Sequence, residues 1–360
     1  MLTIRDVFDA CRRKEGEGKR VINAHIGEPS HEPPVQLREL RIGEMGRKYL
    51  PFVGTEAARE SVSHFGSEFL RRDLEKDRIF ITNGGAQSLL ISTLVTSKIR
   101  RGRILVPAPG FPQYFEHASE FGYQISTYDP LAEDLVNEVT SKLEGVSGVL
   151  INYPNNPTGF VQPNSELRDL WDELRRRNVL LINDAAYSQI YFGERVEVVG
   201  DVIADTFSKT FALPGLRIGY IYWGAERPEL VGRILYLMTA GVSEISQFIL
   251  MKMIEAASDD YFRRVREHYA KLKDEVVREA RKAGLIFPEP RGAFYLYSMH
   301  PNVPDSNELA MKLLNRDPVV GIVPAAAFRG GKEYFRISYG VLSEGDIREL
   351  FRAIREVTSQ

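Results

Sequence analysis

Short apolar runs alternate with longer amphipathic segments in the middle of the chain, and this alternation constrains the fold more than any other feature of the sequence. The apolar runs predict strands at residues 78–82, 103–107, 123–129, 148–154, 179–184, 201–207 and 217–223. The segments between them predict helices at 85–99, 113–122 and 164–177, the last capped by Asn164. Continuous apolar strands separated by helices are typical of a mostly parallel sheet with helices on both faces.

The C-terminal third has a different pattern. Helical material from about residue 228 to 283 is followed by predicted strands at 292–299 and 333–340 and predicted helices at 306–314 and 343–357. A chain of 360 residues is long enough for two domains. We therefore predict a large α/β domain at residues 40–260 and a smaller α+β domain formed by residues 1–39 and 261–360.

Composition excludes several classes of protein. The net charge of -2 lacks the basic excess of a nucleic-acid-binding protein. The single cysteine, Cys11, cannot form an internal disulfide or a cysteine metal cluster, and we expect no metal site. The charged N-terminal residues lack the apolar core of a signal peptide, and no apolar stretch is long enough to cross a bilayer. We expect a cytoplasmic protein that does not bind membranes.

Polar, Gly- and Pro-rich stretches follow five of the predicted strands. They are Asn83–Gly85, Pro107–Pro112, Pro154–Gly159, Asp184–Tyr187 and Thr206–Lys209. Ligands bind at the carboxyl ends of the strands in such sheets. Topology therefore gathers a carboxylate, a phenol, an amide, hydroxyls and an amine around one crevice.

Three of these stretches allow a structural reading beside a functional one. Gly84 and Gly85 open a helix whose N-terminus could bind phosphate, although a plain strand-to-helix turn needs the same glycines. The prolines of "NYPNNPTG" stiffen a loop that could hold the Asn156 amide in place, or could simply lead into the next helix. Asp184 is either a buried carboxylate in need of a partner or a helix cap.

Lys209 lies in "DTFSKTFALPGLRIGY", the most informative stretch. A lysine at a strand end in a covered crevice is partly desolvated, which favours the neutral amine that a Schiff base requires. Thr206, Ser208 and Arg217 add hydroxyls and a cation suited to phosphate. A surface lysine beside a structural arginine is the alternative, but it leaves this concentration of donors unexplained.

Together these motifs resemble the class I/II aminotransferases, which depend on pyridoxal 5'-phosphate and have fold type I. The resemblance covers nearly the whole chain and rests on motifs in matching order: "HIGEPS", "KYLPFVGTEAARESV", "TNGGAQ", "PAPGFPQY", "NYPNNPTG", "NDAAYSQIYF", "TFSKTFALPGLRIGY", "GAFYLY" and "FRISYG". It implies a mostly parallel seven-stranded sheet flanked by helices in a large cofactor-binding domain, with the smaller α+β domain beside it.

The resemblance implies roles for five polar residues at the reaction centre. Lys209 would form the Schiff base with the cofactor and then shuttle a proton. Asp184 would face the pyridine nitrogen, and Asn156 and Tyr187 would hydrogen-bond the phenolic oxygen of the ring. Arg336 would clamp the substrate α-carboxylate.

Further residues would hold the cofactor and the substrate. The phosphate cradle implied by the resemblance consists of Gly85, Ala86, Gln87, Thr206, Ser208 and Arg217. Phe111 would stack on the ring, Gly27 would let the backbone approach the substrate, and Tyr49 would reach the phosphate in a neighbouring subunit. A homodimer with active sites at the interface is therefore implied.

The implied reaction transfers the α-amino group of aspartate, alanine or an aromatic amino acid to a 2-oxo acid such as 2-oxoglutarate in a ping-pong cycle. A pyridoxal-phosphate lyase that catalyses β-elimination and an aminotransferase of the histidinol-phosphate type are the alternatives on the same fold. A decarboxylase and a non-enzymatic ligand-binding module or regulator also remain open, although the retained lysine argues against the regulator.

Overall fold

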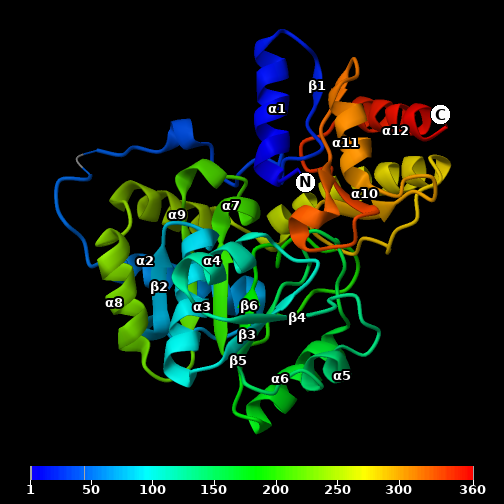
Figure 1. The fold of residues 1–360 in the computed structure, drawn as a ribbon. Coiled ribbons are helices and arrows are strands. Elements are labelled where there is room, and N and C mark those ends of the chain that lie inside the picture. The colour runs from blue at the N-terminus through cyan, green and yellow to red at the C-terminus, as the bar shows by residue number, and fades with distance from the viewer. Residues whose placement is uncertain (1, 44, 360) are drawn as a thin grey trace.

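The computed structural model describes residues 2–43 and 45–359, which form two groups of elements (Figure 1). The larger group surrounds a seven-stranded sheet with the order β2-β8-β7-β6-β5-β3-β4. Its strands are β2 (Ile79–Thr82), β3 (Arg103–Pro107), β4 (Ile125–Tyr128), β5 (Val146–Ile151), β6 (Leu180–Asp184), β7 (Val202–Thr206) and β8 (Gly219–Trp223). Only β8 is antiparallel to its neighbours in this sheet, so the predicted mostly parallel sheet is confirmed.

Burial explains why these strands are visible in the sequence. Every residue of β2, β5, β6, β7 and β8 is buried. A strand covered on both faces has no solvent-facing positions and therefore shows a continuous apolar run. The polar residues Asp184, Asp205 and Thr206 are exceptions to this pattern, and they lie at the carboxyl ends of β6 and β7.

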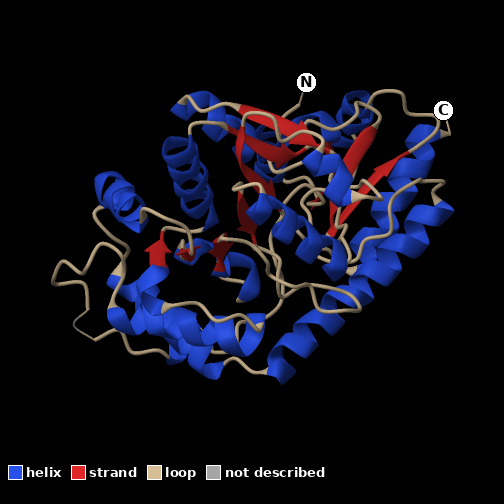
Figure 2. Cartoon of the chain, turned by 90° about the horizontal axis from the view of Figure 1, so that it is seen from below, coloured by secondary structure: helices blue, strands red, loops and turns tan. Residues whose placement is uncertain are grey.

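Helices flank the strands (Figure 2). Helix α3 (Gly85–Arg100) packs against β5, β7 and β8, and its residues from Ser88 to Thr93 are all buried. The other helices of this group are α2 (Glu56–Phe65), α4 (Gln113–Phe121), α5 (Leu135–Thr140), α6 (Asn164–Arg176), α7 (Phe207–Thr210), α8 (Pro228–Thr239) and α9 (Glu244–Ala256). Among the described residues, no helix combines the length and the apolar composition needed to span a bilayer.

The smaller group joins the N-terminal segment to the C-terminal third of the chain (Figure 1). Its strands are β1 (Val21–Ile22), β9 (Tyr295–Met299), β10 (Val319–Val320), β11 (Val323–Pro324) and β12 (Tyr334–Ser338). Its helices are α1 (Ile4–Gly16), α10 (Asp259–Lys282), α11 (Ser306–Leu314) and α12 (Glu344–Thr358). β11, β12 and β9 form an antiparallel sheet, whereas β1 pairs in parallel with β10. The domain limits at residues 40 and 260 stay a prediction.

Two local expectations are corrected by the structure. Pro163 occupies the N-cap position of α6, and Asn164 instead uses its side chain to bind the Arg195 carbonyl at 2.8 Å and the Glu197 amide at 2.9 Å. Arg217 precedes strand β8 and has a left-handed backbone with φ of 51°. This turn separates Arg217 from the strand and places it on the wall of the cavity described next.

Candidate active site

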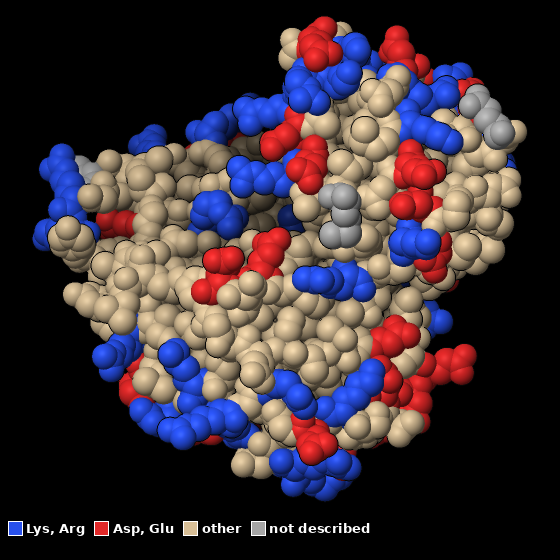
Figure 3. All heavy atoms as spheres, in the orientation of Figure 1, with Lys and Arg blue, Asp and Glu red and all other residues tan. Residues whose placement is uncertain are grey.

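A cavity of about 310 Å³ opens where the carboxyl ends of the parallel strands meet the smaller group of elements. The space-filling view shows a hollow between the two groups, with Lys and Arg atoms at its edge and inside it (Figure 3). All of the residues predicted for the site line this cavity except Gln87 and Tyr49. The residues that follow the predicted strands thus meet at one cavity.

Lys209 reaches the cavity from α7, a single helical turn directly after β7. Its Nζ donates a hydrogen bond to the Gly27 carbonyl at 2.5 Å. Burial is the largest cause that lowers the pKa of this amine; Glu28 opposes the shift, Arg336 and Arg217 add to it, and together they bring the pKa to about 8. At neutral pH roughly a tenth of this amine is therefore uncharged, which makes it a usable nucleophile.

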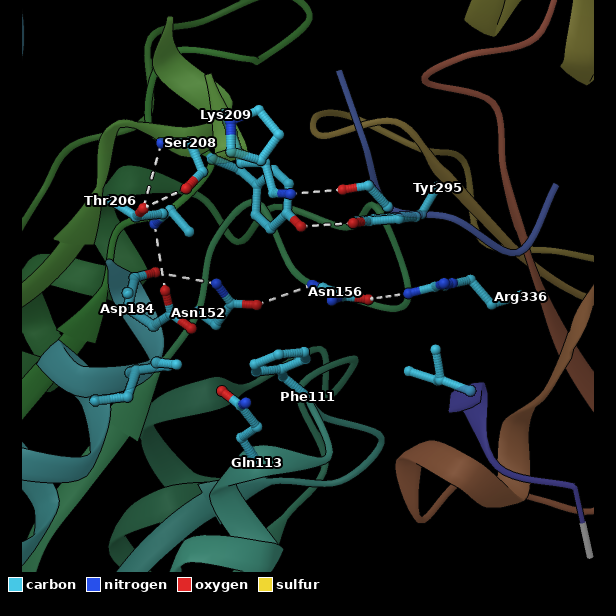
Figure 4. A pocket seen from close by; sticks show the side chains of 18 of the residues that line it. Phe111, Gln113, Asn152, Asn156, Asp184, Thr206, Ser208, Lys209, Tyr295 and Arg336 are labelled. Atoms are coloured by element: carbon cyan, nitrogen blue, oxygen red, sulfur yellow. Dashed lines mark hydrogen bonds between the residues drawn. The ribbon is translucent and has the colours of Figure 1, made fainter. Parts of the chain in front are cut away.

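Asp184 ends strand β6 and is buried beside the cavity (Figure 4). Its Oδ2 accepts a hydrogen bond from the Tyr114 hydroxyl at 2.5 Å, and Oδ1 accepts one from the Ala186 amide at 3.3 Å. Burial raises the pKa of this carboxyl to about 6, although both hydrogen bonds oppose the shift. Asp184 is therefore mostly ionised at pH 7, and a buried anion of this kind favours a cationic ligand.

Asn156 connects the Asp184 end of the cavity to the Arg336 end (Figure 4). Its backbone amide donates to Asn152 Oδ1 at 2.8 Å, and Asn152 in turn donates to the Asp184 carbonyl at 3.0 Å. Asn156 Oδ1 accepts a hydrogen bond from Arg336 at 3.0 Å. Asn156 is thus held through both its backbone N–H and its side-chain oxygen, as expected for a residue on a proline-stiffened loop.

An anion cradle lies between the start of α3 and the turn before β8. The Gly85 and Ala86 amides open α3, where no preceding turn supplies carbonyl partners. A Cβ at Gly84 would lie 2.6 Å from the Arg217 guanidinium, so glycine allows this cation to pack against the helix N-terminus. Thr206 Oγ1 donates to Ser208 Oγ at 2.9 Å on the same wall. Amides, hydroxyls and a guanidinium together suit a phosphate.

Arg336, on β12, lies at the other end of the cavity. Its guanidinium stacks between the rings of Tyr295, at 4.7 Å, and Phe328, at 4.8 Å. One terminal nitrogen donates to Asn156, the other donates to the His25 carbonyl at 2.5 Å, and Nε is buried without a partner. A buried guanidinium that lacks a carboxylate within the described part of the chain is suited to an anionic substrate.

The two predicted residues that do not line the cavity have other surroundings. Gln87 turns its side chain back to accept a hydrogen bond from the Asn83 amide at 2.8 Å. Tyr49 is fully exposed, at 100%. Within this single chain, neither side chain is placed to contact a ligand in the cavity.

Among the described residues, three polar side chains that line the cavity were not predicted from the sequence: Gln113, Asn152 and Tyr295. Tyr114, which bonds to Asp184, was not predicted either. Tyr114 lies in the motif "PAPGFPQY" and Tyr295 in "GAFYLY", and membership in these motifs was the only sequence feature that could have marked the two residues. Their polar contacts join residues 70 and 108 positions apart, so the motif alone could not show them.

These residues fit pyridoxal 5'-phosphate. The cofactor carries an aldehyde, a basic ring nitrogen and a phosphate. The cavity offers an amine of lowered pKa at Lys209, a buried carboxylate at Asp184 and a separate cradle of anion-binding groups. Each part of the cofactor thus has a partner of suitable chemistry on its own wall.

Comparison with known proteins identifies the family of this chain. The model of the family Aminotransferase class I and II matches residues 19–354. An aspartate aminotransferase of Pyrococcus horikoshii is 27% identical over 97% of this chain and 93% of its own length. Aromatic-amino-acid aminotransferase 2 of Thermococcus litoralis is 26% identical over 95% of this chain and 92% of its own length. A solved structure titled as a double mutant of Thermus thermophilus aspartate aminotransferase has a TM-score of 0.87, with 22% identity and coverage of 99% and 97%.

The fold and the cavity thus define an enzyme that uses pyridoxal phosphate. The chain belongs to the class I and II aminotransferases, with a central sheet of fold type I. It is an aminotransferase and requires pyridoxal 5'-phosphate, as the resemblance implied.

Proposed function

We propose that this enzyme transfers the α-amino group of an amino acid to a 2-oxo acid such as 2-oxoglutarate in a ping-pong cycle. One observation carries the proposal: the Lys209 amine, the Asp184 carboxylate and the Arg336 guanidinium all face the same cavity. Amino-group transfer needs an amine for the aldehyde, an anion for the ring nitrogen and a cation for the α-carboxylate.

Lys209 and Asp184 act on either side of the reacting atoms in this proposal. Bound pyridoxal 5'-phosphate supplies an aldehyde carbon and an electron-withdrawing ring. Lys209 would hold the cofactor covalently at its aldehyde carbon, whose oxygen leaves as water, and the amine, once free, would move a proton at the substrate Cα. Asp184 would hold the proton on the ring nitrogen, because its negative charge is buried and no cation among the described residues pairs with it.

Other residues of the same wall orient the cofactor. We assign hydrogen bonds to the phenolic oxygen to Tyr187 and Asn156, and ring stacking to Phe111, which lies below Asn156 in Figure 4. The phosphate is assigned to Gly85, Ala86, Thr206, Ser208 and Arg217. Gln87 supports this cradle from behind through its hydrogen bond to Asn83.

Arg336 receives the α-carboxylate of the substrate. Its stacked position fixes the plane of the guanidinium, and the unpartnered Nε leaves a donor for an oxygen of the ligand. Gly27 lies on the cavity wall beside Lys209, so the backbone there can approach the substrate. We divide the chain as the sequence suggested, with the cofactor on the domain of residues 40–260.

We also propose a homodimer. Helix α8 exposes Tyr236 at 57%, Leu237 at 70% and Met238 at 40%, and Phe52 packs edge-on against Tyr236. Contiguous exposed apolar side chains are typical of a protein interface. Docking of a second copy on this patch would give the exposed Tyr49 a role at the neighbouring site.

Mixing two impaired variants tests the shared site. Lys209→Ala supplies an intact Tyr49, and Tyr49→Ala supplies an intact Lys209, so exchange of subunits is expected to restore one complete site per mixed dimer. A gain of activity on mixing, with a dimer mass by sedimentation, supports the proposal. A monomer in sedimentation, or no gain after verified subunit exchange, rejects it.

The nature of the cavity wall informs the choice of amino donor. Ile4 and Leu89 give the cavity apolar lining, which favours an alanine or aromatic donor over aspartate. Amino-acid panels with 2-oxoglutarate test the function, with glutamate and the new oxo acid as products. Release of pyruvate or ammonia without an acceptor would instead indicate the lyase, and turnover of histidinol phosphate alone would indicate the other alternative.

A further inference from the structure

Tyr295 lies at the point where the two sheets face each other across the cavity. It begins strand β9 of the three-stranded sheet and is only 1% exposed. Its hydroxyl lies 2.5 Å from the hydroxyl of Tyr187, which follows strand β6 of the seven-stranded sheet. The two rings meet edge to face, with centroids 5.5 Å apart.

The same hydroxyl explains why position 27 is a glycine. A Cβ on Gly27 would lie 2.4 Å from the Tyr295 oxygen, a distance that no side chain could keep without displacing the tyrosine. The Gly27 carbonyl is the acceptor for Lys209 Nζ. Tyr295 therefore packs directly against the backbone that holds the predicted catalytic lysine.

The ring of Tyr295 makes a second, separate contact. The Arg336 guanidinium lies over it at 4.7 Å, and Phe328 covers the opposite face at 4.8 Å. Stacking between two rings restricts a guanidinium to one plane and leaves its edge free for a carboxylate. One side chain thus touches both the phenol proposed for the cofactor and the cation proposed for the substrate.

We propose that Tyr295 is a positioning residue that aligns the two ends of the site. Either hydroxyl could be the donor in this hydrogen bond. We assign the donor role to Tyr295, because this leaves the Tyr187 proton free to point into the cavity, and we assign to the Tyr295 ring the fixing of the Arg336 plane. The inference rests on the roles proposed above for Tyr187 and Arg336. A donor that itself accepts a hydrogen bond is polarised and becomes a stronger donor.

Tyr295→Phe tests the hydroxyl, because it keeps the ring and therefore the stacking on Arg336. A weaker Tyr187 donor stabilises the anionic phenolic oxygen of the cofactor less. We expect the midpoint of the cofactor absorbance change with pH to rise by about half a pH unit to one unit. The KM for the amino acid is expected to stay within about twofold.

Tyr297→Phe is the matched control, since it removes a hydroxyl from the same strand, where the ring stacks on Tyr334 instead. This control should leave the midpoint unchanged. Tyr295→Leu removes the ring as well, and there we expect the KM to rise about tenfold. Should Tyr295→Leu fail to fold, the absorbance titration of Tyr295→Phe still tests whether the Tyr295 hydroxyl acts on the cofactor end.

A double-mutant cycle tests whether Tyr295 acts through Tyr187. In a Tyr187→Phe background, Tyr295→Phe is expected to cause no further shift of the midpoint. A midpoint for Tyr295→Phe equal to that of the control, or additive shifts in the cycle, would overturn the inference. Failure of the wild-type protein to show any pH-dependent cofactor absorbance would instead count against the proposed roles at the site.

Discussion

The two ends of the cavity are built in different ways. At the cofactor end, Asp184, Thr206 and Lys209 lie at or just after the ends of adjacent parallel strands, so the sheet itself positions them. At the substrate end, Arg336 bonds to Asn156 and His25, which are 180 and 311 positions away along the chain. The proposed cofactor end therefore depends on neighbouring strands of one sheet, whereas the proposed substrate end depends on contacts between segments far apart in the chain.

Lys209→Ala should have the largest effect, because it removes the nucleophile and the proton carrier of the cofactor end together. We expect kcat to fall at least about a thousandfold, while equilibrium dialysis still detects the cofactor in its phosphate cradle. Lys252→Ala, on an exposed ion pair of α9, serves as a control. Turnover near the wild-type rate in the Lys209 variant would show that Lys209 is neither the nucleophile nor the proton carrier.

Asp184→Asn should lower kcat about a hundredfold, because an amide cannot hold the ring-nitrogen proton. The thermal stability of the unloaded variant, unlike its kcat, should not fall. Burial raises the pKa of Asp184 from 3.8 to about 6, so the stabilising contribution of this group is present below pH 3.8 and is lost as the pH rises through about 6. At pH 7 the unloaded variant should therefore melt at or above the wild-type temperature, which calorimetry can measure. A lower melting temperature would mean that Asp184 is chiefly structural.

Arg336→Lys should affect the substrate end selectively. A lysine cannot stack between Tyr295 and Phe328 or bind a carboxylate with two nitrogens, so we expect the KM for the amino acid to rise about tenfold to a hundredfold. Cofactor absorbance should stay normal. Arg348→Lys, an exposed change on α12, should leave both quantities unaltered. Loss of cofactor binding in the Arg336 variant would show that the two ends are not separable.

The pH dependence of the rate of cofactor binding tests whether the pKa of Lys209 is lowered. Burial lowers the pKa of Lys209 from 10.5 to about 8, and only the neutral amine attacks an aldehyde. Stopped-flow absorbance of unloaded protein mixed with the cofactor should therefore show a rate that rises about tenfold per pH unit below 8 and then levels off. A rate that still climbs steeply at pH 10 would mean that Lys209 behaves as an exposed lysine.

Tyr114→Phe should have the smallest effect. The change removes the hydroxyl that donates to Asp184, so the pKa of that carboxyl should rise further. We expect a few-fold loss of kcat at pH 6 and almost none at pH 8. Tyr128→Phe, which removes another buried hydroxyl, is the matched control. An equal loss at both pH values would point to a packing defect in α4.

The sequence identified the cofactor end better than the substrate end for a physical reason. Continuous apolar runs mark buried strands, and polar residues directly after them must meet at one edge of the sheet. Tyr295 and Tyr114 were missed as site residues because their contacts arise only when separate segments pack together. Arg217 was placed in a strand because no local pattern reveals its left-handed turn. Arg336 was assigned through family resemblance, since its partners lie far away in the chain.

Borohydride reduction of the loaded protein tests the central claim most directly, because it converts the bond between cofactor and lysine into a stable one that mass spectrometry can locate. We expect the added mass on the peptide that contains Lys209 and no added mass in Lys209→Ala. Cofactor fixed to a different lysine, or no fixed cofactor in a protein that still transaminates, would contradict the role of Lys209 as the lysine that binds the cofactor.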